Sequence, residues 1–154
     1  MSKPNKAKKI CESLASKIKN EFSDFNLILS PAMGGVIIGY ELGKILDKQT
    51  IFSERVNSEF KLRRDFRIKE KDKVLIVEDV ITTGKSSMEC SKLVTINNAS
   101  IVGYACIIDR SNSKSEIKGK IVSQLELNIP TYSKDNLPKE LLSIQAVKPG
   151  SRNL

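Results

Sequence analysis

The stretch VLIVEDVITTGKSS, from Val74 to Ser87, joins a β-branched apolar run, two adjacent acidic residues and a glycine turn rich in hydroxyl groups. The apolar run around Lys73 to Val77 predicts a central strand, and a helix is expected to begin at Gly84. A strand that leads directly into a helix is one βα unit. This stretch therefore predicts an α/β fold.

The same alternation recurs along the rest of the chain. Asn26 to Ser30 is a short apolar run typical of a buried strand, and Pro31 to Gly35 forces a turn before a helix that ends near Asp47. Other segments predict an amphipathic helix at about 5–21 and strands at 49–52, at 99–109 and from residue 121. Strands alternating with helices predict a mainly parallel central sheet with helices on both faces, in a single domain spanning residues 1–154.

Composition narrows the class of protein. The 154 residues are 40% hydrophobic, and their longest apolar runs are too short for a membrane span. Three widely spaced cysteines and no histidine favour reduced core thiols and a cytoplasmic location over disulfides or a zinc site. The net charge of +8 is compatible with nucleic acid, but the basic residues form no single tract and aromatics are only 5%. We therefore expect phosphorylated small molecules, and not nucleic acid, as partners.

Three loops are expected to meet at one edge of the predicted sheet. They are Pro31 to Gly35, Glu78 to Ser86 and Asp109 to Ser113, and each follows a predicted strand. In open α/β sheets, ligands bind beyond the carboxyl ends of the strands. The candidate site is therefore expected where these loops converge.

Glu78 and Asp79 are adjacent carboxylates at the predicted end of a buried strand. They should repel each other unless vicinal hydroxyls or a metal compensate, although a lone pair of this kind can also be a solvated strand end. The following residues, Thr82 to Ser86, lie where a helix starts, so backbone N–H groups and hydroxyls can form a nest for an anion. A monophosphate fits better than a triphosphate, because the P-loop pattern is absent. An ordinary N-cap is the alternative interpretation.

Taken together, the pattern of apolar residues, Glu78-Asp79 and Thr82 to Ser86 resembles the PRPP-binding motif of type I phosphoribosyltransferases. The resemblance implies that the carboxylates hold the ribose hydroxyls of 5-phosphoribosyl 1-diphosphate (PRPP) and that the turn holds its 5-phosphate. Pro31 to Gly35 would be the pyrophosphate loop, although a Gly-Gly turn alone is more often structural. The implied PRPP-binding residues are Gly34, Gly35, Glu78, Asp79, Val80, Ile81, Thr82, Thr83, Gly84, Lys85 and Ser86. Mg²⁺ would be bound mainly through PRPP, with Asp79 as the protein side chain that could join its shell.

Three further stretches, Phe52 to Phe66, Ile107 to Ser111 and Lys148 to Arg152, resemble orotate phosphoribosyltransferases. This likeness implies that Arg110 and Thr82 contact orotate. A planar guanidinium suits the carboxylate or carbonyl edge of a pyrimidine, although Asp109-Arg110 alone would more often be a surface ion pair. The implied reaction is displacement of pyrophosphate from C1 of PRPP by N1 of orotate, which gives orotidine 5′-monophosphate in pyrimidine biosynthesis.

The chain departs from this family's pattern at two places. The pyrophosphate loop has no lysine, so we expect a cation from the charged hairpin 53–67 to act there. The candidates are Arg55, Lys61, Arg63 and Arg64. In the family this hairpin is mobile and reaches a neighbouring subunit, which implies a homodimer.

The second departure is at the N-terminus. The family pattern includes a segment upstream of the first helix with a lysine that helps to hold orotate and PRPP, and Met1 here directly precedes that helix. The expectation is a chain that binds PRPP but forms orotidine monophosphate slowly. Two alternatives stay open: a phosphoribosyltransferase for a purine or another base, and a regulator that binds PRPP or a nucleotide without turnover.

Overall fold

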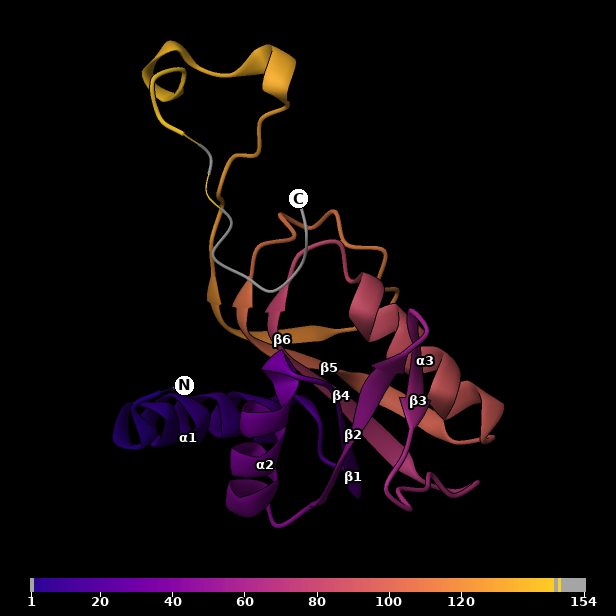
Figure 1. Cartoon of the computed structure of the whole chain (residues 1–154). Helices are drawn as coiled ribbons and strands as arrows, with labels where there is room; N and C mark the ends of the chain where they lie inside the picture. The colour runs from indigo at the N-terminus through magenta and orange to yellow at the C-terminus, as the bar shows by residue number, and fades with distance from the viewer. Residues whose placement is uncertain (1, 146, 148–154) are drawn as a thin grey trace.

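The computed structural model of the protein describes residues 2–145 and 147. Its main elements, in chain order, are α1 Pro4–Glu21, β1 Leu27–Pro31, α2 Gly34–Leu46, β2 Gln49–Val56, β3 Glu59–Leu62, β4 Lys73–Ile81, α3 Lys85–Ile96, β5 Ser100–Asp109 and β6 Ile121–Glu126. One six-stranded sheet runs in the order β3-β2-β1-β4-β5-β6 (Figure 1). All neighbouring strands are parallel except β2 and β3, which form an antiparallel hairpin at one edge. The predicted mainly parallel α/β fold is confirmed.

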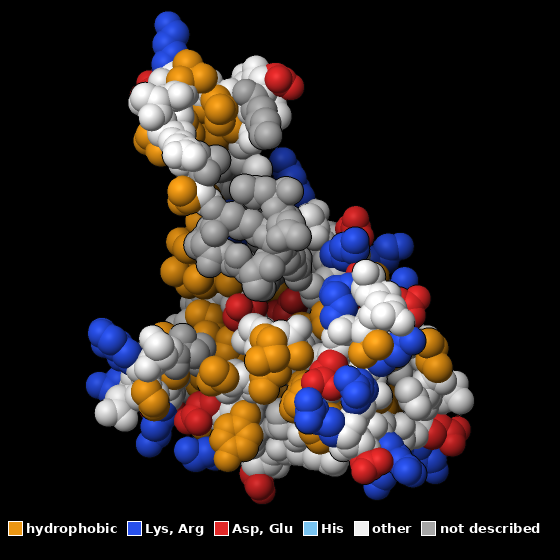
Figure 2. Space-filling view, in the orientation of Figure 1, with side chains coloured by type: hydrophobic (Ala, Val, Ile, Leu, Met, Phe, Trp, Pro, Cys, Tyr) orange, Lys and Arg blue, Asp and Glu red, His pale blue; other side chains and the backbone are white. Residues whose placement is uncertain are grey.

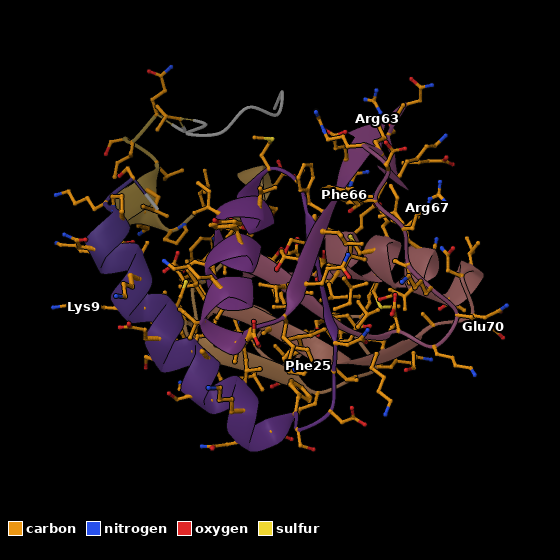
Figure 3. All side chains as sticks on the ribbon, turned by 90° about the horizontal axis from the view of Figure 1, so that it is seen from below. Lys9, Phe25, Arg63, Phe66, Arg67 and Glu70 are labelled. Atoms are coloured by element: carbon orange, nitrogen blue, oxygen red, sulfur yellow. The ribbon has the colours of Figure 1, made fainter. Side chains whose placement is uncertain are left out.

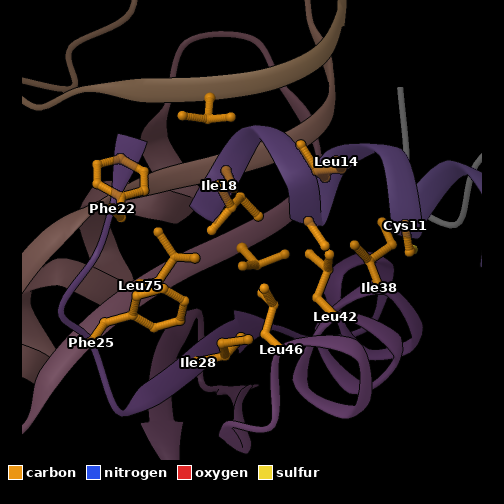
Figure 4. Close-up of a cluster of buried hydrophobic side chains, with 14 residues drawn as sticks. Cys11, Leu14, Ile18, Phe22, Phe25, Ile28, Ile38, Leu42, Leu46 and Leu75 are labelled. Carbon is orange, nitrogen blue, oxygen red and sulfur yellow. The ribbon is translucent and has the colours of Figure 1, made fainter. Parts of the chain in front are cut away.

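Helices cover both faces of the sheet. Successive side chains of a strand point to opposite faces, so an apolar strand needs cover on both sides. Leu75 and Val77 of β4 join a buried cluster with α1 and α2, which Figure 4 shows from within. Val74 and Ile76 of the same strand join a second cluster with Cys90 and Val94 of α3. Figure 3 shows the resulting layers, with α1 and α2 on one side of the sheet and α3 on the other. The central strands β1 and β4 therefore bury apolar side chains on both faces of the sheet, over residues 27–29 and 74–77.

Two strands are longer than the sequence predicts. β4 continues through Ile81, so Glu78 and Asp79 lie inside the strand and not at its end. The reason is pairing with β5, where Glu78 lies opposite Cys106 and Val80 opposite Ile108, so that the backbone stays hydrogen-bonded beneath polar side chains. β2 likewise extends to Val56 and takes up the first residues of the charged segment, whose remainder forms the predicted hairpin with β3.

Beyond β6 the chain leaves the body as a projecting arm, whose outer part carries two short 3₁₀ helices at Lys134–Asn136 and Lys139–Leu141 (Figure 1). The stretch from Lys148 to Arg152, which contributed to the resemblance, lies outside the described residues. Within the described part of the chain, no helix is long and apolar enough to cross a membrane.

The cysteines are reduced and interior, as their spacing predicts. Cys11, Cys90 and Cys106 are all free thiols in the core. Burial is the main cause of their raised pKa values, which reach about 11 for Cys11 and about 12 for Cys90 and Cys106. These thiols therefore stay protonated at neutral pH and behave as small apolar side chains.

Candidate active site

Two adjoining hollows lie at the carboxyl ends of β1, β2 and β4. The first, which we call the α3 hollow, has a volume of about 420 Å³ and is lined by Arg55, Ser58, Glu78, Val80, Thr82, Thr83, Gly84, Lys85, Ser86 and Glu89. The second, the α2 hollow, has a volume of about 370 Å³ and is lined by Pro31, Ala32, Met33, Gly34, Gly35, Arg55, Phe60, Glu78, Asp79 and Ser86. Arg55, Glu78 and Ser86 line both. The two hollows therefore form one continuous site with a shared wall.

The turn of the α3 hollow is shaped by Gly84. This residue is the N-cap of α3, and its φ of +81° lies in the left-handed region that glycine adopts without strain. Gly84 has no side chain to cap the helix, and the hydroxyl of Thr83 accepts a hydrogen bond of 3.3 Å from the N–H of Lys85. The helix N-terminus, the hydroxyls of Thr82 and Ser86 and the lysine together make a setting that favours an anion.

The α2 hollow is shaped by the close approach of the loop after β1 to β4. A Cβ atom on Gly34 would lie 2.5–2.6 Å from the carboxylate of Asp79, and one on Gly35 would lie 2.8 Å from the carbonyl oxygen of Val77. Only glycine fits at both positions without displacing a neighbour. The peptide bond between Ala32 and Met33 in this loop is cis. The backbone of this loop therefore lies against β4 at Val77 and Asp79.

Glu78 and Asp79 point to opposite faces of β4, because they are adjacent in a strand. Glu78 extends toward α3, where its Oε2 accepts a hydrogen bond from the hydroxyl of Ser87. Asp79 extends toward α2 and Gly34, and its Oδ1 accepts a hydrogen bond of 2.9 Å from the N–H of Val80. The expected repulsion between the two carboxylates is thereby reduced, although both still line the α2 hollow.

Arg55 is the basic side chain that lines both hollows. Its Nη2 lies 2.6 Å from Glu89 Oε2, its Nη1 donates a 2.5 Å hydrogen bond to the carbonyl oxygen of Ser58, and its guanidinium stacks 4.2 Å above the centre of the Phe60 ring. These contacts hold the guanidinium at the shared wall. Neither Glu89 nor Phe60 was identified from the sequence, since nothing in the local pattern links residues so far apart in the chain.

The other three basic candidates of the hairpin lie outside both hollows. Arg63 and Arg64 form ion pairs with Glu54, at 3.8 Å and 3.0 Å, and Lys61 lies 3.7 Å from Glu59. Their side chains are at least half exposed. Arg63 directly follows β3, at the open end of the hairpin, and Figure 3 shows it near the edge of the molecule. Within this subunit, Arg55 is thus the best placed of the four predicted cations.

The third predicted loop is tied to the site through its backbone. The N–H of Arg110 donates to the carbonyl oxygen of Ile81 at 2.8 Å, and the N–H of Glu116 donates to that of Thr83 at 3.0 Å. The Arg110 side chain lines neither hollow, and its buried Nε has no hydrogen-bond partner among the residues that the structure describes. The Ile81 side chain also lies away from both hollows, in the core on the α3 side of the sheet. The predicted contact between Arg110 and orotate stays a prediction.

The chemistry of the carboxylates fits a magnesium ion that is held mainly by its substrate. Between residues 2 and 145 and at 147, no group of three or more His, Cys, Asp or Glu side chains could by itself hold a metal. Asp79 and Glu78 nevertheless offer hard oxygen donors at the wall of the α2 hollow. Mg²⁺ prefers one or two carboxylates combined with phosphate oxygens and water.

Comparison with known proteins agrees with this geometry. Residues 3–136 match the phosphoribosyl transferase domain. An orotate phosphoribosyltransferase from Maricaulis maris is 40% identical over 154 residues, which are 99% of this chain and 79% of the relative. One from Methylorubrum populi is 44% identical with the same coverage. The chain belongs to the orotate phosphoribosyltransferase family.

Solved phosphoribosyltransferases share the fold at lower sequence identity. An orotate phosphoribosyltransferase from Aeropyrum pernix superposes with a TM-score of 0.69 at 18% identity, covering 82% of this chain and 74% of that one. An adenine phosphoribosyltransferase from Thermoanaerobacter pseudethanolicus gives a TM-score of 0.70, also at 18% identity, covering 82% and 83%. Orotate and adenine enzymes are thus equally similar in fold, and it is the sequence likeness that separates them.

Proposed function

We propose that the protein transfers the 5-phosphoribosyl group of PRPP to orotate and releases pyrophosphate and orotidine 5′-monophosphate. The observation that carries this proposal is the pair of hollows with a shared wall. PRPP carries a monophosphate at C5 and a diphosphate at C1 of its ribose. The site has an anion-favouring turn on one side of Glu78 and a glycine loop on the other. The membership of the orotate phosphoribosyltransferase family supports the choice of base.

In this arrangement the α3 hollow takes the 5-phosphate, with Thr82, Thr83, Ser86 and the backbone at the start of α3 as donors. Glu78 and Asp79 accept hydrogen bonds from the ribose hydroxyls. The Gly34-Gly35 backbone then lies against the pyrophosphate, which is the leaving group. The proposal thus gives each hollow one end of the same molecule.

The reaction needs no covalent nucleophile from the protein. The ring nitrogen N1 of orotate attacks C1 of PRPP as the bond to pyrophosphate breaks, so the work of the protein is to align the two reactants and stabilise the departing charge. Arg55 at the shared wall is the side chain that we assign to the pyrophosphate. Bound Mg²⁺ would be held by Asp79 together with substrate oxygens, and it would neutralise part of the pyrophosphate charge.

We assign the base side of the site to Thr82 and Arg110. Thr82 lines the α3 hollow, and Arg110 follows the neighbouring strand on a loop that is hydrogen-bonded to the turn. The unpartnered, buried Nε of Arg110 supports a role in binding an anionic partner such as the orotate carboxylate. A rotation of this side chain toward the turn would complete the base pocket.

We further propose that the protein acts as a homodimer through the outer face of α2. Met33, Ile37 and Tyr40 lie one helical turn apart and are 82%, 55% and 68% exposed, so they form an apolar stripe without cover in the single chain. Figure 2 shows apolar side chains over this helix. The stripe begins in the loop of the α2 hollow, where two carboxylates outnumber the one arginine. A second copy seated there would bring the exposed basic hairpin 53–67 near this net negative hollow.

The dimer is tested by light scattering coupled to size-exclusion chromatography. Ile37→Glu should shift the mass from two chains toward one, because it places a charge in the apolar stripe. Ile96→Glu is the matched control, since Ile96 is 77% exposed on α3 and lies outside the stripe. Equal masses for the wild type and Ile37→Glu would count against the interface.

We place the reaction in the cytoplasm and treat the chain as one phosphoribosyltransferase domain. The free, buried thiols support a reducing compartment. The family match, which covers most of the chain, supports the single domain.

The proposed function is tested by calorimetric titration of PRPP in the presence of Mg²⁺. Asp79→Asn should weaken binding by about 10- to 150-fold, because losing one charge-assisted contact costs about 1.5 to 3 kcal/mol. Asp135→Asn, in a short helix of the projecting arm, is a matched control that should leave affinity unchanged. Equal affinity for Asp79→Asn and the wild type would show that the ribose lies elsewhere.

A further inference from the structure

The buried face of α3 carries an unusual number of hydroxyl groups. Four buried residues, Ser87, Cys90, Ser91 and Val94, face the sheet, and two of these are serines. A buried hydroxyl is costly unless it is hydrogen-bonded, so the partners of these serines indicate what each one does. The two serines have different partners.

Ser87 is bonded to the carboxylate that lines both hollows. Its side chain is fully buried, and its hydroxyl donates to Oε2 of Glu78, which is itself 9% exposed. A hydroxyl donor stabilises the charged form of a carboxylate and fixes the rotation of its oxygens. One oxygen of Glu78 is thus held from α3, in a residue that lines both hollows.

We propose that Ser87 is a positioning residue that orients the Glu78 carboxylate for the ribose hydroxyls of PRPP. This inference rests on the proposed function and assigns a role to a residue outside the motif that ends at Ser86. Ser87 lines neither hollow, so it acts on PRPP only through Glu78. It also links α3, whose start holds the 5-phosphate in this scheme, to the strand that holds the sugar.

Ser91 supplies a matched control on the same face of the same helix. Its hydroxyl donates to the carbonyl oxygen of Ser87 at 2.9 Å and lies 2.8 Å from the hydroxyl of Tyr104. Ser91→Ala therefore removes a buried hydroxyl of the same size without removing the donor to the carboxylate.

The experiment measures the affinity for PRPP with Mg²⁺ by calorimetry, and the melting temperature, for the wild type, Ser87→Ala and Ser91→Ala. We expect Ser87→Ala to raise the dissociation constant about 5- to 30-fold, which is less than the direct loss of a carboxylate contact, because Ser87 acts on PRPP only through Glu78. Ser91→Ala should change the dissociation constant less than about 2-fold. It should lower the melting temperature by about as much as Ser87→Ala does. Ser87→Cys is the second variant, for use if Ser87→Ala does not fold. Its thiol is close in shape to the hydroxyl but is a weak hydrogen-bond donor, so it should also lose affinity for PRPP.

A double-mutant cycle with Glu78→Gln separates positioning from general destabilisation. In that background Ser87→Ala should change the affinity less than about 2-fold, because the charge that it orients is gone. An unchanged affinity for Ser87→Ala or Ser87→Cys, or an equal loss in both backgrounds, would overturn the inference. These outcomes leave PRPP binding by the wild type intact, whereas a wild type that binds no PRPP would overturn the proposed function as well.

Discussion

Substituting Gly34 by alanine should disable the sugar-binding carboxylate without unfolding the protein. The new Cβ would lie 2.5 Å from Oδ2 and 2.6 Å from both Cγ and Oδ1 of Asp79, whereas ordinary van der Waals contact begins at 3.4 Å. The whole carboxylate would therefore have to retreat by about 0.9 Å. Gly34 does not have a positive φ, so its backbone accepts alanine, which also favours a helix.

The displaced carboxylate can no longer meet the ribose hydroxyls at hydrogen-bonding distance. Losing a charge-assisted contact costs about 1.5 to 3 kcal/mol, so the dissociation constant for PRPP should rise about 10- to 150-fold. The assay is calorimetric titration of PRPP with Mg²⁺, together with a thermal melt. We expect the melting temperature to change little, since the displaced group is at the wall of a hollow and not in the core.

Gly43→Ala is the control for a clash within α2. Gly43 lies near the other end of α2, and its added Cβ would meet the side chain of Thr50. This substitution should lower the stability of the fold without changing the affinity for PRPP. In an Asp79→Asn background, Gly34→Ala should lose most of its effect, because both changes remove the same contact. If Gly34→Ala bound PRPP as tightly as the wild type, the assignment of Asp79 to the sugar would be refuted.

Three further changes test other parts of the site. Arg110→Ala should raise the Michaelis constant for orotate by about 10-fold or more while leaving PRPP affinity unchanged, and equal losses for both would indicate a structural role. Arg55→Gln should lower kcat by about 10²-fold and change the affinity for orotate little, because it removes the positive charge that stabilises the departing pyrophosphate. The pKa of Cys11 is raised from 9.0 to about 11 and those of Cys90 and Cys106 to about 12, so the folded state holds these protons more tightly than the unfolded state. The contribution of these thiols to the free energy of unfolding should therefore be constant below pH 9. It should fall as the pH rises from 9 toward 11 and 12, by up to about 1.4 kcal/mol per thiol and pH unit. Urea unfolding of the wild type and of Cys11→Ala at stepped pH measures this fall.

Much of the fold was predictable because the apolar runs are short and β-branched, and because the segments between them have apolar residues at helical spacing. β4 was predicted too short, since the charged residues Glu78 and Asp79 suggested a strand end. In the structure, hydrogen bonding to β5 continues under them through Ile81. The alternation of side chains along a strand would also have indicated that the two carboxylates point apart.

The surroundings of the site depend on contacts between distant residues. The ion pair between Arg55 and Glu89 joins β2 to α3, and the hydrogen bond from Ser87 to Glu78 joins α3 to β4. No local pattern indicates either partner. Sequence reasoning could name four basic residues in the hairpin but could not choose among them, because the choice depends on how β2 packs against α3.

The most direct test of the central claim is to identify the nucleotide that the protein makes. Purified protein is incubated with PRPP, Mg²⁺ and equal concentrations of orotate, adenine and hypoxanthine, and the products are identified by mass spectrometry. We predict orotidine 5′-monophosphate with an equal amount of pyrophosphate, and no purine nucleotide. Formation of a purine monophosphate, or PRPP binding without any nucleotide product, would contradict the claim that this chain transfers phosphoribose to orotate.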